Sequence, residues 1–229
     1  MAVSISASPV QLFCKGILFD MDGILISSIG SVERSWTKWA RMRGVDLQIA
    51  LKVIHGRRSI DSVAQLRPDL DADAENQLIE QMEIDDMEGI EVLPGVHALL
   101  ASLPSERWTV VTSATGPLAR ARLGAVGIQV PGRVVTAESV IEGKPHPAPY
   151  LAGAEILGFA PEECVVFEDA ESGTKAARAA GCTVIATTFS HPVDRLSEAN
   201  YLIPDLTVVT AGLATERDAI ALKLTRLLV

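Results

Sequence analysis

Two acidic residues, Asp20 and Asp22, directly follow a short apolar run at positions 16–19. The run has the composition of a buried strand, and side chains two positions apart on a strand point to the same side. Both carboxylates would then reach one reaction centre, so two acids could share its chemistry. The pair alone is equally compatible with a solvated strand end, so the rest of the chain has to decide.

Three further groups of polar residues lie where a site for phosphoryl transfer would need them. Ser113 follows the apolar run at 108–112, where its hydroxyl and the backbone N–H groups of the next turn, including that of Ala114, would favour an anion. Lys144 lies between a glycine and a proline and would place a compact positive charge on a phosphate. Glu168 and Asp169 end another run and are oxygen ligands of the kind that Mg²⁺ prefers. Each group alone is compatible with a helix cap or a surface charge, but the ordered set predicts one site.

Short apolar runs alternate with helix-like stretches along most of the chain. The composition predicts strands at 16–19, 108–112, 133–136, 164–167, 183–187 and 201–203, and helices at 95–103, 117–126, 148–157 and 172–180. Strand and helix alternate from about residue 94 onward, which predicts a doubly wound, parallel α/β sheet.

The segment 26–92 interrupts this pattern, because it has helical spacing and no convincing strand. We expect a core domain from residues 1–25 and 93–229 and a helical insertion from residues 26–92. The insertion follows the first strand and would lie over the carboxyl end of that strand, where open α/β sheets bind ligands. Within it, Trp36 and Trp39 are spaced like one face of a helix, and buried packing is favoured over a ligand role.

The composition limits the classes of function. The chain has 229 residues, 48% of them apolar and 21% charged, which is typical of a globular protein. A net charge of -9 argues against a nucleic-acid partner but allows a small anionic substrate in a locally positive pocket. Cys14, Cys164 and Cys182 form no CxxC pair and are expected to be reduced core residues. Neither a signal peptide nor a membrane-spanning run is evident, so we expect no membrane partner and a cytoplasmic protein, as a monomer or homodimer.

Four segments together carry a resemblance to a known family. The sequences DMDG, VVTSAT, GKPHPAPYL and VFEDAESGTKAARAAG resemble the four motifs of the haloacid dehalogenase superfamily, and the insertion resembles its helical cap. The resemblance implies that Asp20 is the nucleophile and that Asp22 is the general acid and base. It also implies that Ser113 and Lys144 hold the phosphate. Mg²⁺ would be bound by Asp20, the Asp22 backbone carbonyl and Asp169, with Glu168 as a direct or outer ligand.

Further details resemble the sugar-phosphate and glycerol-phosphate phosphatases among the capped members. His55, Arg57 and Arg58, in the sequence HGRR, are candidates for substrate contact, with plain surface charge as the alternative. The family usually has threonine where this chain has Ile24, which removes a hydroxyl near the site. The predicted function is a Mg²⁺-dependent phosphatase that hydrolyses a small phosphate monoester through an aspartyl-phosphate.

Three other functions share part of this set of residues or of the fold that it implies. A mutase of the β-phosphoglucomutase type shares all four motifs, but such mutases carry a histidine where this chain has Val32. A dehalogenase lacks the second aspartate and the metal ligands, whereas Asp22, Glu168 and Asp169 are present here. A non-catalytic, phosphate-binding regulatory protein is disfavoured because Asp22 would activate water and shorten the life of an acyl-phosphate.

Overall fold

A five-stranded parallel sheet forms the centre of the molecule, in the order β6-β3-β7-β8-β9. The computed structural model describes residues 5–6, 9–54, 57–130, 132–225 and 227–228. The strands of the sheet are β3 (Gly16–Phe19), β6 (Trp108–Val110), β7 (Cys164–Glu168), β8 (Thr183–Thr187) and β9 (Tyr201–Ile203). The α/β fold class predicted from the sequence is confirmed.

Both faces of this sheet are covered, which explains why its strands are apolar without alternation. On β3, Ile17 and Phe19 face one apolar cluster while Leu18 faces another. The second cluster includes residues of α7 (Ala148–Leu157) and α8 (Glu171–Ala180). The helices between the strands are α5 (Val96–Ala101), α6 (Gly116–Ala125), α7 and α8, as the sequence predicted within two residues at most ends.

An antiparallel sheet covers part of the other face, and the sequence analysis did not predict it. Its strands, in the order β10-β11-β2, are β2 (Val10–Cys14), β10 (Val209–Ala214) and β11 (Ala219–Leu224). Leu222 and Leu224 of β11 join the apolar cluster that contains Ile17 and Phe19. A two-stranded pair, β1 (Ile5–Ser6) with β12 (Leu227–Leu228), lies near the termini.

The segment at 133–136 was predicted as a strand, but only Val135 pairs with the sheet edge, through a single bridge to Val111. The Thr109 hydroxyl donates a hydrogen bond of 2.6 Å to the Arg133 carbonyl. A side chain therefore binds the backbone group that a longer strand would have used for pairing.

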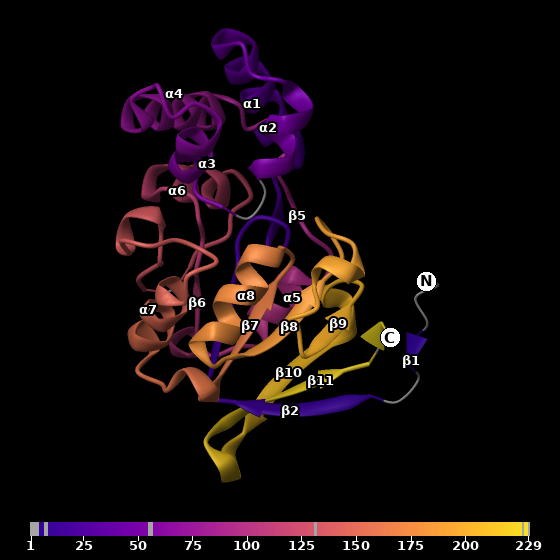
Figure 1. Cartoon of the computed structure of the whole chain (residues 1–229). Coiled ribbons are helices and arrows are strands. Elements are labelled where there is room, and N and C mark those ends of the chain that lie inside the picture. Colours follow the sequence, from indigo (N-terminus) through magenta and orange to yellow (C-terminus); the bar gives the residue numbers. More distant parts are fainter. Residues whose placement is uncertain (1–4, 7–8, 55–56, 131, 226, 229) are drawn as a thin grey trace.

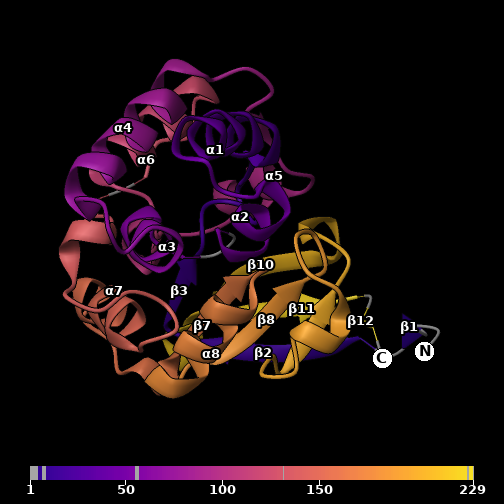
Figure 2. The same cartoon turned by 45° about the horizontal axis from the view of Figure 1, so that its top comes forward.

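Four helices follow strand β3 in the sequence and gather at one end of the molecule (Figure 1). They are α1 (Ile29–Arg43), α2 (Leu47–Val53), α3 (Ser59–Leu66) and α4 (Ala72–Asp85). Two short strands, β4 (Ile26–Ser27) and β5 (Glu91–Val92), pair antiparallel where the chain enters and leaves this helical insertion. The sequence of this segment predicted no strand. Figure 2 shows the four helices beside α6, away from the antiparallel strand β2.

The helical insertion has an apolar cluster of its own. Trp36 and Trp39 are buried in it with Ile79 of α4, so their predicted packing role agrees with the structure. Cys14, Cys164 and Cys182 are buried and unpaired, as expected. Within the described part of the chain, no helix is both long and apolar enough to cross a membrane.

Candidate active site

Three carboxylates meet at the carboxyl edge of the parallel sheet. Phe19 of β3 is in register with Phe167 of β7, so Asp20 and Glu168 leave adjacent strands at the same level. The backbone N–H of Asp20 donates to the Phe167 carbonyl at 3.0 Å, which extends the pairing by one bond. Oxygens of Asp20, Glu168 and Asp169 lie within 4.8 Å of one another, and all three residues are buried. The sheet register therefore brings together residues that are 149 positions apart at most.

Lys144 contributes a buried ammonium group to these carboxylates. Its Nζ donates hydrogen bonds of 2.6 Å to both Asp20 Oδ1 and Glu168 Oε1, and one of 3.1 Å to the Val111 carbonyl. Burial alone would lower the pKa of Lys144, but the charges of Asp20 and Glu168 raise it above its ordinary value. Lys144 is therefore a permanent cation at neutral pH.

Glu168 is held by four hydrogen bonds. Oε1 accepts from Lys144 and from the Tyr150 hydroxyl, each at 2.6 Å. Oε2 accepts from the backbone N–H groups of Asp169, at 2.9 Å, and Ala170, at 3.1 Å. Burial acts to raise the pKa of Glu168, but Lys144 and these donors bring it below the ordinary value. Glu168 is therefore ionised and fixed in position.

Negative charge is in excess at this edge of the sheet. Burial raises the pKa of Asp20 to about 8, despite the opposing effect of Lys144 and with a further increase from Glu168. Burial, followed by the charges of Glu168 and Asp20, raises the pKa of Asp169 well above its ordinary value. Three buried carboxylates thus face one ammonium group. A divalent cation with oxygen ligands would offset the remaining charge, so these residues fit Mg²⁺.

Two glycines allow the acidic residues to pack closely against the backbone. Gly23 has φ of +86°, and a Cβ there would lie 1.7 Å from Asp169 Oδ2. A Cβ at Gly173, on the first turn of α8, would lie 1.7 Å from Glu168 Oε1. The glycines of DMDG and ESG are therefore required by the position of the two neighbouring acids.

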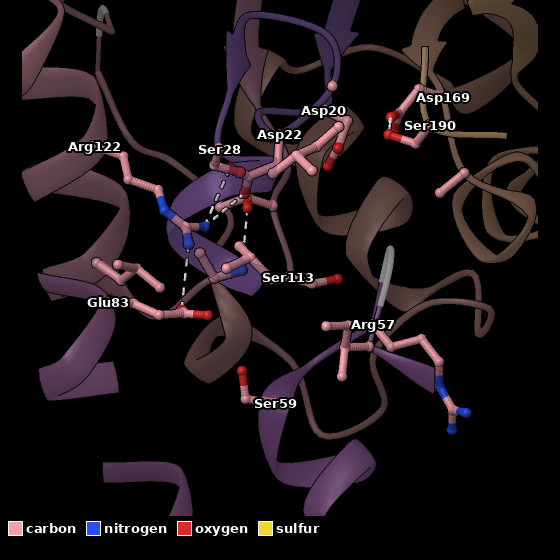
Figure 3. A pocket seen from close by; sticks show the side chains of 18 of the residues that line it. Asp20, Asp22, Ser28, Arg57, Ser59, Glu83, Ser113, Arg122, Asp169 and Ser190 are labelled. Atoms are coloured by element: carbon pink, nitrogen blue, oxygen red, sulfur yellow. Dashed lines mark hydrogen bonds and ion pairs between the residues drawn. The ribbon is translucent and has the colours of Figure 1, made fainter. Parts of the chain in front are cut away.

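Asp22 points into the same pocket but has different partners. Its Oδ1 accepts a hydrogen bond of 2.5 Å from the Ser28 hydroxyl, and both of its oxygens accept from Arg122 Nη1 at 3.1 Å. Arg122 Nη2 lies 3.3 Å from Glu83 Oε2 (Figure 3). Burial raises the pKa of Glu83 to about 7, although Arg122 opposes the change. The chain of contacts runs from the loop after β3, through α6, to α4 of the helical insertion.

A cavity of about 90 Å³ connects these groups. It is small compared with the roughly 300–1,000 Å³ of pockets for drug-sized ligands, so it fits a small substrate. Polar residues from both the sheet edge and the helical insertion line it, including Asp20, Asp22, Ser28, Arg57, Ser59, Glu83, Ser113, Arg122, Asp169 and Ser190.

Of the other predicted site residues that the structure describes, some line this cavity and others do not. Ser113 and Ala114 line it, but the Ala114 N–H is already bound to Thr112 Oγ1 at 3.1 Å. Arg57 lines it and donates to Gln65 Oε1 at 2.9 Å. His55 lies outside the described residues.

Arg58 contacts the core beside the cavity and is not one of the described residues that line it. It pairs with both oxygens of Asp61, at 2.8 and 2.9 Å, and donates to the Ile141 carbonyl at 2.9 Å. It therefore fastens the helical insertion to the loop that precedes Lys144.

Comparison with known proteins decides the family. The family model of haloacid dehalogenase-like hydrolases matches residues 14–181. The chain belongs to the haloacid dehalogenase-like hydrolases. It is 42% identical over 212 residues to hexitol phosphatase A of Escherichia coli K12, covering 90% of this chain and 98% of the relative. It is 34% identical over 212 residues to glycerol-1-phosphate phosphohydrolase 2 of Saccharomyces cerevisiae, covering 86% and 83%.

The fold is also similar to that of a β-phosphoglucomutase from Clostridium difficile, with a TM-score of 0.70, 20% identity and coverage of 84% and 92%. The haloacid dehalogenase-like fold is therefore shared with a mutase and does not by itself separate hydrolysis from isomerisation. The family predicted from the sequence, and the enzyme class of phosphoric monoester hydrolase, are confirmed.

Sequence reasoning missed several residues of this haloacid dehalogenase-like site. Tyr150 was expected only to begin a helix, yet its hydroxyl binds Glu168. The Ser190 hydroxyl donates to Asp169 Oδ2 from a loop with no recognisable motif. Arg122 and Glu83 did carry a signal. Arg122 lies four positions after the buried Leu118 on α6, and Glu83 lies four positions after the buried Ile79 on α4. This spacing places each charged residue on the buried face of its helix.

Proposed function

We propose that this chain is a Mg²⁺-dependent phosphatase that hydrolyses a small sugar phosphate or glycerol phosphate through an aspartyl-phosphate on Asp20. One observation carries the proposal. The Asp20 carboxylate accepts a hydrogen bond from the Lys144 ammonium group, lies beside two further buried carboxylates, and lines a cavity that Asp22 also lines. The names of the two curated relatives support the substrate class.

The residues would act in two steps. Asp20 attacks phosphorus in line, a bond forms between its carboxylate oxygen and phosphorus, and the bond from phosphorus to the ester oxygen breaks. Asp22 gives its proton to the leaving alcohol. Asp22 then takes a proton from a water molecule that attacks the aspartyl-phosphate, which releases inorganic phosphate and restores Asp20. The Ser113 hydroxyl would hold a non-bridging oxygen, and the positive charge of Lys144, which already donates three hydrogen bonds, would offset the charge of the phosphoryl oxygens.

The metal site would use the carboxylates of Asp20 and Asp169 with the backbone carbonyl of Asp22. Bound Mg²⁺ supplies positive charge that neutralises the phosphoryl oxygens. Both oxygens of Glu168 already accept two hydrogen bonds each, so Glu168 is better suited to fix Lys144 than to bind the ion directly.

The helical insertion at 26–92 would serve as a cap. Trp36 and Glu83 line the cavity from α1 and α4, so its closure would exclude water and contact the alcohol part of the substrate. Arg57 also lines the cavity, so it is a further candidate for substrate contact.

Phosphate release tests the proposal. Purified protein is assayed with Mg²⁺ or with EDTA on sugar phosphates, glycerol phosphates and nucleotides, beside Asp20→Asn and the control Asp85→Asn, which neutralises an exposed residue of α4. We expect activity with Mg²⁺, none with EDTA, and a loss of at least about 10³-fold in Asp20→Asn. Acid quench during turnover should trap phosphate on the peptide that contains Asp20.

Two outcomes would favour the alternatives. Isomerisation of β-glucose 1-phosphate without phosphate release would indicate a mutase, although Val32, at the position of the mutase histidine, gives the cavity no proton-transferring group. Binding of phosphate esters without any turnover would indicate a regulatory protein.

A further inference from the structure

The Arg122 guanidinium has hydrogen-bonding capacity that the described residues do not fill. The residue is 3% exposed and lines the cavity. Its Nη1 binds Asp22, but Nε and Nη2 have no hydrogen-bond partner among the described residues. Nη2 lies 3.3 Å from Glu83 Oε2, close enough for an ion pair but not aligned for a hydrogen bond. Buried donors without partners are costly, so two such atoms at one cavity point to a ligand.

Glu83 places an acceptor beside these donors. It is 3% exposed and reaches the cavity from α4. A hydroxyl group both donates and accepts hydrogen bonds, so it complements a carboxylate and a guanidinium that lie side by side. The single positive charge of Arg122 faces two carboxylates, Asp22 and Glu83, so this place offers no net positive charge to attract an anion. The chemistry fits neutral hydroxyl groups.

The position of Asp22 indicates which part of a substrate would lie here. Under the proposed function, Asp22 protonates the leaving oxygen, and Arg122 binds Asp22 directly. The pair of Arg122 and Glu83 is therefore on the alcohol side of the ester. Figure 3 shows Arg122 and Glu83 turned toward each other, with Arg57 directed away from them. Apolar residues complete this part of the cavity, and a carbon chain would pack against them, namely Val32, Trp36, Ile54 and Leu118.

We propose that Glu83 and Arg122 bind the hydroxyl groups of the alcohol, so that the enzyme selects phosphate monoesters of polyhydroxylated alcohols over those of simple alcohols. This inference rests on the proposed function and adds the residues that determine its specificity. The binding energy comes from hydrogen bonds to charged groups, and a substrate that lacks the hydroxyls leaves those groups unpaired.

Two comparisons test this inference. In the wild-type protein, kcat/KM for glycerol phosphate and sorbitol 6-phosphate should exceed that for propyl phosphate by at least tenfold. In Glu83→Gln, which keeps the shape but changes the acceptor, that ratio should fall by at least tenfold, mainly through a higher KM for the polyol phosphates. Asp85→Asn neutralises an exposed carboxylate on the same helix and should keep the wild-type ratio.

The outcomes separate this inference from the proposed function. Equal activity on all three esters in the wild type would overturn the specificity inference and leave the phosphatase intact. A wild-type protein with no activity on any ester would overturn both. If thermal melting shows that Glu83→Gln does not fold, the wild-type ratio of kcat/KM between polyol phosphates and propyl phosphate decides whether the enzyme selects hydroxylated alcohols. If the variant folds and keeps the wild-type ratio, Glu83 has no part in that selection.

Discussion

Lys144 lies between two buried carboxylates, and this position makes the residue important for folding as well as for chemistry. Lys144→Met keeps most of the side-chain volume but leaves Asp20 and Glu168 close together with no cation between them. Removing one partner of a buried ion pair typically costs about 3–5 kcal/mol. We expect the free energy of unfolding, measured by urea titration in EDTA, to fall by about that amount.

Lys15 offers a matched comparison for this substitution. It forms an ion pair of 2.7 Å with Glu163, but both side chains are well exposed, and exposed pairs contribute little. Lys15→Met should therefore leave the urea midpoint nearly unchanged. Equal midpoints for Lys144→Met and the wild type would mean that the buried carboxylates do not depend on Lys144 for their stability.

At the residue scale, the sequence predicted the groups that stand in recognisable motifs and missed those that meet only in space. Asp20, Lys144 and Asp169 follow strand ends or lie in a tight turn, and the structure brings them together. Arg122 and Glu83 belong to two helices with mixed sequences, and their contact depends on how α4 packs against α6. Spacing along one helix can place a charge on the buried face, but it cannot name the partner on another helix.

At the scale of elements, α7 packs closely on the sheet through a glycine. A Cβ at Gly153 would lie 2.7 Å from Val111 Cγ2 and 3.1 Å from Leu18 Cδ2. Both neighbours belong to the buried cluster on that face, so they have little room to move. Gly153→Ala should reduce the free energy of unfolding by about 1–3 kcal/mol, as measured by urea titration.

A glycine-to-alanine substitution in α6 should instead raise the free energy of unfolding. Gly124 is exposed, and a Cβ there would meet no atom within 4 Å. Because alanine favours the helix over glycine, Gly124→Ala should stabilise the protein by up to about 1 kcal/mol. A loss of stability in both variants would show that the helix backbone, and not contact with the sheet, sets the effect at Gly153.

The sequence predicted the buried parallel strands better than the antiparallel ones. Strands β3, β7 and β8 are almost entirely buried and mainly apolar, because helices cover one face and other apolar residues the opposite face. Strand β10 contains threonine, glycine and alanine, and only Val209 of its six residues is fully buried, so it has neither an apolar run nor a clear alternation. Its strand conformation depends on antiparallel pairing with β11, and the residues of β10 alone do not predict that pairing.

At the scale of the whole molecule, the helical insertion and the sheet have separate apolar clusters. Polar contacts join the helical insertion to the core domain. They include Arg58 with the Ile141 carbonyl, Thr115 with Glu80, and Arg122 with Glu83. Interfaces of this kind permit relative motion of domains. We therefore expect residues 26–92 to open and unfold as a unit while the sheet stays folded.

Hydrogen exchange with two matched variants tests this expectation. Ile79 in the helical insertion and Ile185 in β8 are both fully buried, and truncation of either to alanine typically costs about 2–5 kcal/mol. Ile79→Ala should accelerate amide exchange in α1, α3 and α4 by at least about 30-fold and leave β7 and β8 at their wild-type rates. Ile185→Ala should accelerate exchange in β7 and β8. Equal acceleration in both parts by Ile79→Ala would show that the molecule unfolds as one cooperative unit, with no independent cap.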